Sequence, residues 1–199
     1  MSSDQTITGF LDALADKQPT PGGGAAAAMT GATAAATASM VVSYSLGKKK
    51  LAEHEESNQA AGKQLANARV MFLKLAEEDA EGYGVLNALW SLDKDDPKRV
   101  ARWDAAVAGA IAPPRAMLAL AVDLLMRIES LVPTTNRMLR SDLGVAAVLA
   151  EAAARAAAWN VRINLPLVDE TAGGRIGEEI DAELAHASSL CAAIEKGCA

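Results

Sequence analysis

Cysteine, histidine and aromatic residues are all scarce in this chain, and each shortage excludes something. The two cysteines, Cys191 and Cys198, and the two histidines, His54 and His186, lack the spacing of a zinc site, so we expect no bound metal. Aromatic residues make up only 4% of the chain, which disfavours β-sheets, where they are normally enriched. Alanine is heavily used instead, and this favours closely packed helices.

An excess of basic residues is also missing. The formal net charge of -6 disfavours binding to the phosphate backbone of nucleic acids, although a local basic patch can still hold a small anion. Residues 1–4 lack the basic-then-apolar pattern of a secretory signal peptide, so we expect a cytoplasmic protein. The length of 199 residues fits one domain, 1–199, with a sizeable core.

The pattern of apolar residues predicts an all-α, single-domain bundle of about five to seven helices. No strand-like alternation of useful length and no internal repeat is present. One proline pair and one glycine pair interrupt the pattern. Pro113–Pro114 should kink or break one helix, and Gly173–Gly174 should precede the last one. The expected helices cover residues 4–16, 24–46, 53–90, 141–164 and 175–196, together with one that starts at about Pro97 and precedes a loop after Pro133.

The segment 22–47 carries no charge and is followed by three lysines, which is also the pattern of a membrane span with a positive flank. Most of its residues are Ala, Gly, Thr and Ser, whereas a membrane helix normally contains many more Leu, Ile and Phe. The composition therefore favours a long Ala-rich helix buried on all sides, whose small side chains let neighbouring helices approach closely.

Both ends of this helix carry groups suited to binding. At its start, Pro19-Thr-Pro-Gly-Gly-Gly24 places bare backbone N–H groups at a helix N-terminus, which attracts anions. At its end, Gly47 precedes Lys48, Lys49 and Lys50. The lysines also have a purely structural interpretation, because basic residues after a C-terminal glycine complement the helix dipole.

Asp79 interrupts an apolar stripe on the expected helix 53–90. Its neighbours at three- and four-residue steps are apolar or aromatic: Leu65, Ala68, Phe72, Ala76, Tyr83, Leu86 and Trp90. A carboxylate in that position is either paired with a neighbouring helix or has a raised pKa, as general acids and bases often have. The sequence alone leaves both interpretations open.

Polar residues also lie on the inner face of the expected helix 141–164. Asp142 and Asn160 share this face with alanines, while the charged side chains are expected opposite. Ser141 and Asp142 also suit a helix N-cap, and Asn160 and Asn164 can satisfy backbone groups near the helix end. These structural alternatives stay open as well.

Five segments in this order resemble the cyclodeaminase/cyclohydrolase family. They are Pro19–Ala25, Gly47–Lys50, Glu78–Ala80, Asn136 with Ser141–Val145, and Asn160–Asn164. The family comprises the C-terminal domain of bifunctional formiminotransferase-cyclodeaminases and stand-alone bacterial methenyltetrahydrofolate cyclohydrolases. The resemblance covers residues 10 to about 167.

The sequence departs from the family pattern beside Asn136. The family usually has glycine before this residue and a second asparagine two residues after it, where this chain has Thr135 and Met138. The resemblance implies an all-α homodimer that acts on a folate, with no metal or nucleotide cofactor. From charge and composition we also expect no nucleic-acid or membrane partner. A chain without a formiminotransferase domain is more similar to the hydrolases. The alternatives are a formiminotetrahydrofolate cyclodeaminase, which releases ammonia, and a folate-binding bundle without catalysis.

Cyclohydrolysis requires a base that deprotonates the attacking water, a donor that protonates the departing nitrogen, and groups that bind the folate. From this resemblance, we expect Asp79 to act as the general base, with Asp142 as the second choice for that role. We expect Lys48 to polarise the carbon that water attacks or to donate the proton. We expect the glycine run and Lys49 to hold folate carboxylates, or alternatively the pterin. The expected substrate-binding residues are Pro21, Gly22, Gly23, Gly24, Lys49, Asn136, Ser141, Asn160 and Asn164.

The length of the helices constrains these roles. Gly22 and Lys48 are about 37 Å apart if a helix joins them, and Asp142 and Asn160 about 27 Å. One chain therefore cannot bring both ends to one reacting atom. We expect active sites at a subunit interface, with each site using residues of both chains.

Overall fold

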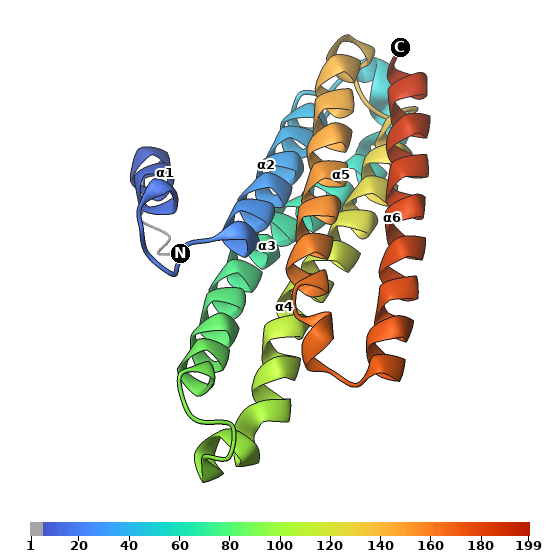
Figure 1. The fold of residues 1–199 in the computed structure, drawn as a ribbon. Coiled ribbons are helices and arrows are strands. Elements are labelled where there is room, and N and C mark those ends of the chain that lie inside the picture. Colours follow the sequence, from blue (N-terminus) through green and yellow to red (C-terminus); the bar gives the residue numbers. More distant parts are fainter. Residues whose placement is uncertain (1–5) are drawn as a thin grey trace.

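The computed structural model describes residues 6–199, and within that range it contains helices and turns but no β-strand. This confirms the all-α prediction. Six α-helices and three short 3-10 helices follow one another along the chain (Figure 1). They are α1 (Ile7–Ala15), α2 (Gly23–Ser43), η1 (Lys49–His54), α3 (Glu55–Trp90), α4 (Pro97–Leu131), η2 (Arg137–Leu139), α5 (Arg140–Arg162), η3 (Leu165–Leu167) and α6 (Glu170–Cys198).

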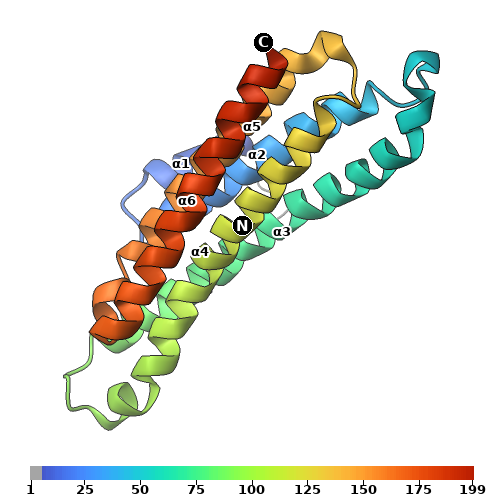
Figure 2. The same cartoon turned by 90° about the vertical axis from the view of Figure 1, so that its right-hand side faces the viewer.

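Helices α2 to α5 form an antiparallel four-helix bundle. Helix α2 packs between α3 and α5, and α4 also contacts both of these helices. Helix α6 covers α4 and α5 from outside, as Figures 1 and 2 show. Helix α1 stands beside the N-terminal end of α2 rather than within the bundle (Figure 1). The N-terminal end of α2 lies beside Asp79 of α3, while its C-terminal end leads towards η1 at one end of the molecule (Figure 1).

Small residues let α2 pack tightly against its neighbours. Most of its buried positions are alanine or glycine. At Gly31, an added Cβ atom would lie 2.5 Å from the ring of Phe72, which is itself fully buried, so a larger residue here would overpack the core. The prediction that this helix is buried on all sides is wrong in one respect: one face of the single chain leaves Thr33 and Met40 exposed.

Helix α4 continues through Pro113 and Pro114, so the expectation of a break is wrong. Each proline lacks the N–H group that would bond the carbonyl four residues earlier, which frees the carbonyls of Gly109 and Ala110. The Asn164 side chain donates to the Ala110 carbonyl at 3.4 Å. The Gly109 carbonyl oxygen lies 2.5 Å from where a Cβ of Gly82 would be, so α3 approaches closely at this point.

Several helix boundaries differ from the sequence-based expectation. Helix α6 begins at Glu170, capped by the Asp169 carboxylate on the Ala172 N–H at 2.9 Å, so Gly173 and Gly174 lie inside it rather than before it. Helix α1 is capped by Thr6, and its predicted start at residue 4 falls outside the described residues. The strong capping preference of Asp169 explains the early start of α6.

Two helices, Gly23–Ser43 and Pro97–Leu131, are long and apolar enough to cross a membrane by length and composition alone. In each of them, 56% of the most apolar stretch is buried inside the bundle. Core helices of globular proteins share these properties, so neither helix is strong evidence for a membrane span.

Candidate active site

A pocket of about 490 Å³ opens at the N-terminal end of α2. It is bounded by the turn before α2, the C-terminal half of α3, the C-terminal end of α5 and Ala110 of α4. Seven of the predicted site residues line it: Pro21, Gly22, Gly23, Gly24, Asp79, Asn160 and Asn164. Its volume is in the range of typical small-molecule sites.

The glycine run allows α2 to approach its neighbours within this pocket. A Cβ atom on Gly24 would lie 2.0 Å from Oδ2 of Asp79, and one on Gly23 would lie 3.0 Å from Oδ1 of Asn160. Only glycine therefore permits the observed position of the Asp79 carboxylate at Gly24. The carboxylate sits at the N-terminus of α2, where the helix dipole favours negative charge.

Burial raises the pKa of Asp79 above its usual value of 3.8, because the partly buried carboxylate loses solvation in its charged form. Within residues 6–199, the carboxylate forms no ion pair. Of the two interpretations that the sequence left open, the structure therefore supports the unpaired carboxylate with a raised pKa. A raised pKa makes the carboxylate a stronger base than an ordinary aspartate, which suits a group that accepts and returns a proton.

The two asparagines at the end of α5 combine structural bonds with free acceptor groups. The Asn160 amide donates to the Ala156 carbonyl at 2.9 Å, and the Asn164 amide donates to the Asn160 carbonyl at 3.0 Å. These bonds confirm that the amides satisfy backbone groups near the helix end. They also fix the orientation of Asn160, whose oxygen then faces Gly23.

The other five predicted site residues lie at the opposite end of the bundle. These are Lys48, Lys49, Asn136, Ser141 and Asp142, and none of them lines the pocket. The 21 residues of α2 separate the two groups by about 31 Å. The prediction that one chain cannot bring both groups together is confirmed.

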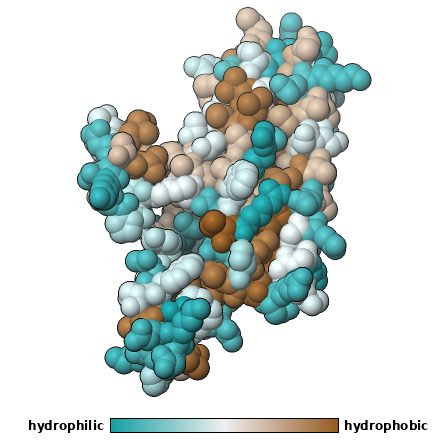
Figure 3. Space-filling model, viewed as in Figure 1, coloured by the Kyte–Doolittle hydropathy of each residue, from teal (hydrophilic) through white to brown (hydrophobic). Residues whose placement is uncertain are grey.

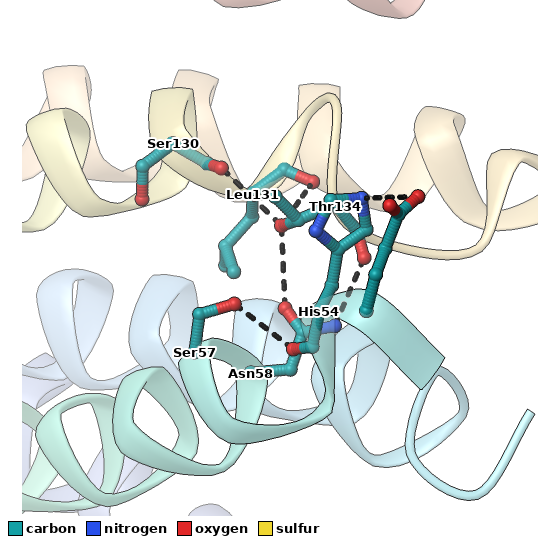
Figure 4. A network of polar contacts seen from close by, with 7 residues as sticks. His54, Ser57, Asn58, Ser130, Leu131 and Thr134 are labelled. Atoms are coloured by element: carbon teal, nitrogen blue, oxygen red, sulfur yellow. Dashed lines mark hydrogen bonds and ion pairs between the residues drawn. The ribbon is translucent and has the colours of Figure 1, made fainter. Parts of the chain in front are cut away.

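These five residues are called the distal group below, and buried polar contacts hold the segments around them in place. The Asn136 N–H donates to the buried Ser45 hydroxyl at 2.9 Å, which ties the 132–139 segment to the end of α2. Asn58, which is 1% exposed, donates to the Thr134 carbonyl at 2.9 Å and accepts from its hydroxyl at 3.2 Å. Figure 4 shows this contact between α3 and the segment after α4.

The lysines and Asp142 surround these contacts. Gly47, in the turn that follows α2, has a left-handed φ of 71°, a conformation that favours glycine, and Lys48 and Lys49 are exposed just beyond it. Helix α5 begins at Arg140, so Ser141 and Asp142 lie in its first turn; the alternative that they are N-caps is wrong. Asp142 is half-buried, while Ser141 is exposed.

Sequence reasoning missed the aromatic part of the pocket. Tyr83 and Trp90 were placed on the apolar stripe of α3 as ordinary members, yet both line the pocket and are 44% and 51% exposed. The spacing from Asp79 was a signal, because it puts both rings on the face of that carboxylate. Ala110 was missed too, although the proline pair indicated a free carbonyl there.

The formiminotransferase-cyclodeaminase family matches residues 6–182. The chain belongs to this family. The match covers both ends of the bundle, including the pocket and the distal group of polar residues.

Individual relatives agree with this family. The chain is 32% identical over 195 residues to a methenyltetrahydrofolate cyclohydrolase of Methylorubrum extorquens, covering 96% of this chain and 94% of the relative. It is 27% identical to the formimidoyltransferase-cyclodeaminase of Sus scrofa, of which it spans only 35%. A crystal structure of formiminotetrahydrofolate cyclodeaminase from Thermotoga maritima superposes with a TM-score of 0.87 at 26% identity, covering 98% of this chain and 96% of the other.

Proposed function

We propose that this protein hydrolyses 5,10-methenyltetrahydrofolate to 10-formyltetrahydrofolate in one-carbon metabolism. The observation that carries the proposal is the partly buried Asp79 carboxylate, which has no ion-pair partner within residues 6–199. It lies at the N-terminus of α2, inside a pocket of substrate size. The similarity to a methenyltetrahydrofolate cyclohydrolase over nearly the full length of both chains supports this reaction. We place the enzyme in the cytoplasm and expect no metal or cofactor.

Asp79 is the general base. The substrate is a cation, and its charge favours binding beside a carboxylate. Water adds to the amidinium carbon between N5 and N10 while Asp79 takes one of its protons. The bond from this carbon to N5 then breaks, N5 receives the proton from Asp79, and the remaining hydroxyl proton leaves to solvent. The product carries the formyl group on N10, and the raised pKa of Asp79 suits both transfers.

The distal group reaches the pocket through a homodimer. Adjacent faces of α2 and α5 carry exposed side chains with almost no charge, which is the character of an interface core rather than of a solvated surface. Figure 3 shows pale and brown surface over α2 and the adjoining upper part of α5. The exposed residues include Thr33 and Met40 on α2, Tyr44 just after it, Val145, Val148, Ala152 and Trp159 on α5, and Ile163 just after it. Arg155 is an exposed charged residue on the same face of α5.

A two-fold axis across this face would set two copies antiparallel. The distal end of one subunit would then lie beside the pocket of its partner. In this arrangement Lys48 polarises the attacked centre or donates a proton, Asp142 is the second acid–base group, and Lys49, Asn136 and Ser141 complete the folate site. Each active site uses both chains.

The cyclodeaminase reaction is the second candidate, because the Thermotoga relative with this fold is named for it. Both reactions break a bond at the same one-carbon bridge region, and the same carboxylate serves either. The two are separated by their products, since only the cyclodeaminase releases ammonia.

We expect the purified protein to accelerate the loss of 5,10-methenyltetrahydrofolate absorbance over a buffer blank at neutral pH, with 10-formyltetrahydrofolate as the product. Ammonia release from formiminotetrahydrofolate is measured in parallel, and we expect none above the blank. Ammonia release without cyclohydrolysis would assign the chain to the cyclodeaminases. The absence of both activities, with folate binding retained, would leave a binding protein and contradict the proposal.

A further inference from the structure

The outer half of the pocket is lined by aromatic side chains that the proposed chemistry does not use. Tyr83 and Trp90 follow Asp79 on the same face of α3, at about 6 Å and 16 Å along the helix axis. Both rings remain about half exposed although they line a pocket. Large aromatic surfaces of this kind are characteristic of sites that receive a planar ligand group.

Other side chains hold Trp90 in place. The ring of Trp103 meets it edge-on, with centroids 5.9 Å apart and an interplanar angle of 82°. The Arg99 guanidinium lies 4.4 Å above the Trp103 ring and donates to the Leu92 carbonyl at 2.7 Å. The indole is therefore fixed in advance, which lowers the entropy lost when a ligand stacks on it.

The pocket changes in character along α3. Around Asp79 it is lined by small residues, Gly24, Ala25, Ala76 and Ala80, which leave room for a flat ring system beside the carboxylate. Towards the C-terminal end of α3 the lining becomes aromatic. A ligand with a polar bicyclic head and an aryl tail matches this order.

The position of Asp79 also sets the direction of the ligand. The N-terminus of α2 already faces the Asp79 carboxylate. A ligand carboxylate bound there would be repelled by a like charge at short range. The carboxylates of a folate therefore belong at the other end of the pocket, away from the glycine run.

We propose that Tyr83 and Trp90 bind the p-aminobenzoylglutamate half of the folate, so that its pterin ring and one-carbon bridge lie at Asp79 and its glutamate leaves towards the α3–α4 turn. This rests on the proposed cyclohydrolase function. The aryl ring is attached to N10 and therefore lies next to the reacting carbon, so Tyr83, one turn beyond Asp79, carries this ring. Trp90 contacts the benzoylglutamate portion beyond it.

The test compares Trp90→Leu with Trp90→Phe, which keeps an aromatic ring. We expect Trp90→Leu to raise KM for 5,10-methenyltetrahydrofolate about tenfold with kcat within twofold of wild type, because stacking is lost but the reacting end is untouched. Trp90→Phe should recover most of the affinity. Val85→Ala, an exposed α3 position outside the pocket, is the matched control and should leave KM unchanged.

p-Aminobenzoylglutamate itself serves as a probe of the same contacts. It should inhibit wild type competitively and inhibit Trp90→Leu at least about fivefold more weakly. If wild type turns over the substrate but Trp90→Leu has the wild-type KM and is inhibited equally well by p-aminobenzoylglutamate, this orientation is wrong and the proposed function stands. If wild type shows no turnover, the proposed function fails first, and loss of p-aminobenzoylglutamate binding in Trp90→Leu still decides the orientation.

Discussion

Replacing Asp79 by Asn is expected to lower kcat for 5,10-methenyltetrahydrofolate by about 10² to 10⁴-fold, the usual contribution of a general base. The amide keeps the size and shape of the side chain but cannot accept a proton. Folate binding should persist, since the other lining residues are unchanged. The measurement is initial-rate absorbance decay with the buffer blank subtracted, together with equilibrium binding of 10-formyltetrahydrofolate.

The pH profile of the wild type gives an independent readout of the same residue. Because Asp79 acts in its ionised form, kcat/KM should rise with pH on the acidic side, and burial places the midpoint above the usual aspartate pKa of 3.8. In Asp79→Asn this acidic limb should disappear from the residual activity.

Stability distinguishes catalysis from a structural role. A raised pKa means that the folded protein holds the proton on Asp79 more tightly than the unfolded chain does, so the ionised carboxylate lowers stability above that pKa. Asp79→Asn should therefore have a Tm equal to or higher than that of wild type at neutral pH. A lower Tm combined with normal turnover would show that Asp79 serves packing.

Gly24→Ala is expected to lower kcat/KM by about 10²-fold although it leaves the chemical identity of every reactive group unchanged. The new Cβ would lie 2.0 Å from Oδ2 of Asp79, so this short side chain must rotate out of its position. Misplacement of a catalytic group by about 1 Å is enough for such a loss. The fold should survive, because the clash is with a side-chain end at the pocket wall and not with backbone.

Gly177→Ala on α6 is the matched control, since no atom lies within 4 Å of its added Cβ. It should keep full activity, and its stability should equal that of wild type or exceed it by up to about 1 kcal/mol, because alanine is the better helix former. Circular dichroism and thermal unfolding of both variants separate misfolding from misplacement. Wild-type kcat/KM in a folded Gly24→Ala variant would remove Asp79 from the mechanism.

Much of the fold was predictable because local signals agreed with the tertiary structure. The uncharged Ala-rich run became the central helix α2, although this helix ends at Ser43, before the predicted end at residue 46 and before Gly47 with its left-handed φ. The prolines of α4 show where such reasoning stops. Their cost inside a helix is real, but Asn164 and the bare Gly82 accommodate the freed carbonyls, and neither contact is visible from local sequence.

The sequence offered these site residues but did not predict which of them meet. The glycine run, Asp79 and Asn160 line one pocket, while the exposure of Tyr83 and Trp90 depends on the gap between α3 and its neighbours. Periodicity gives the face on which a side chain lies, but not whether another helix covers it. The distal residues around Lys48 remain a prediction, since they depend on a second chain.

Mixing two inactive variants tests the account most directly. Asp79→Asn and Lys48→Ala subunits, carrying different affinity tags, are co-expressed and purified over both tags. If each active site takes Asp79 from one chain and Lys48 from its partner, one site of the mixed dimer has both defects and the other has none. As a control, Asp79→Asn is paired with Gly24→Ala, whose defects lie in the same pocket and should leave both sites inactive.

If the sites are shared, the Asp79→Asn/Lys48→Ala dimer should regain about half of the wild-type cyclohydrolase activity per dimer, while each variant alone and the control pair stay inactive. A mixed dimer that is as inactive as its two parents would contradict a site shared between subunits.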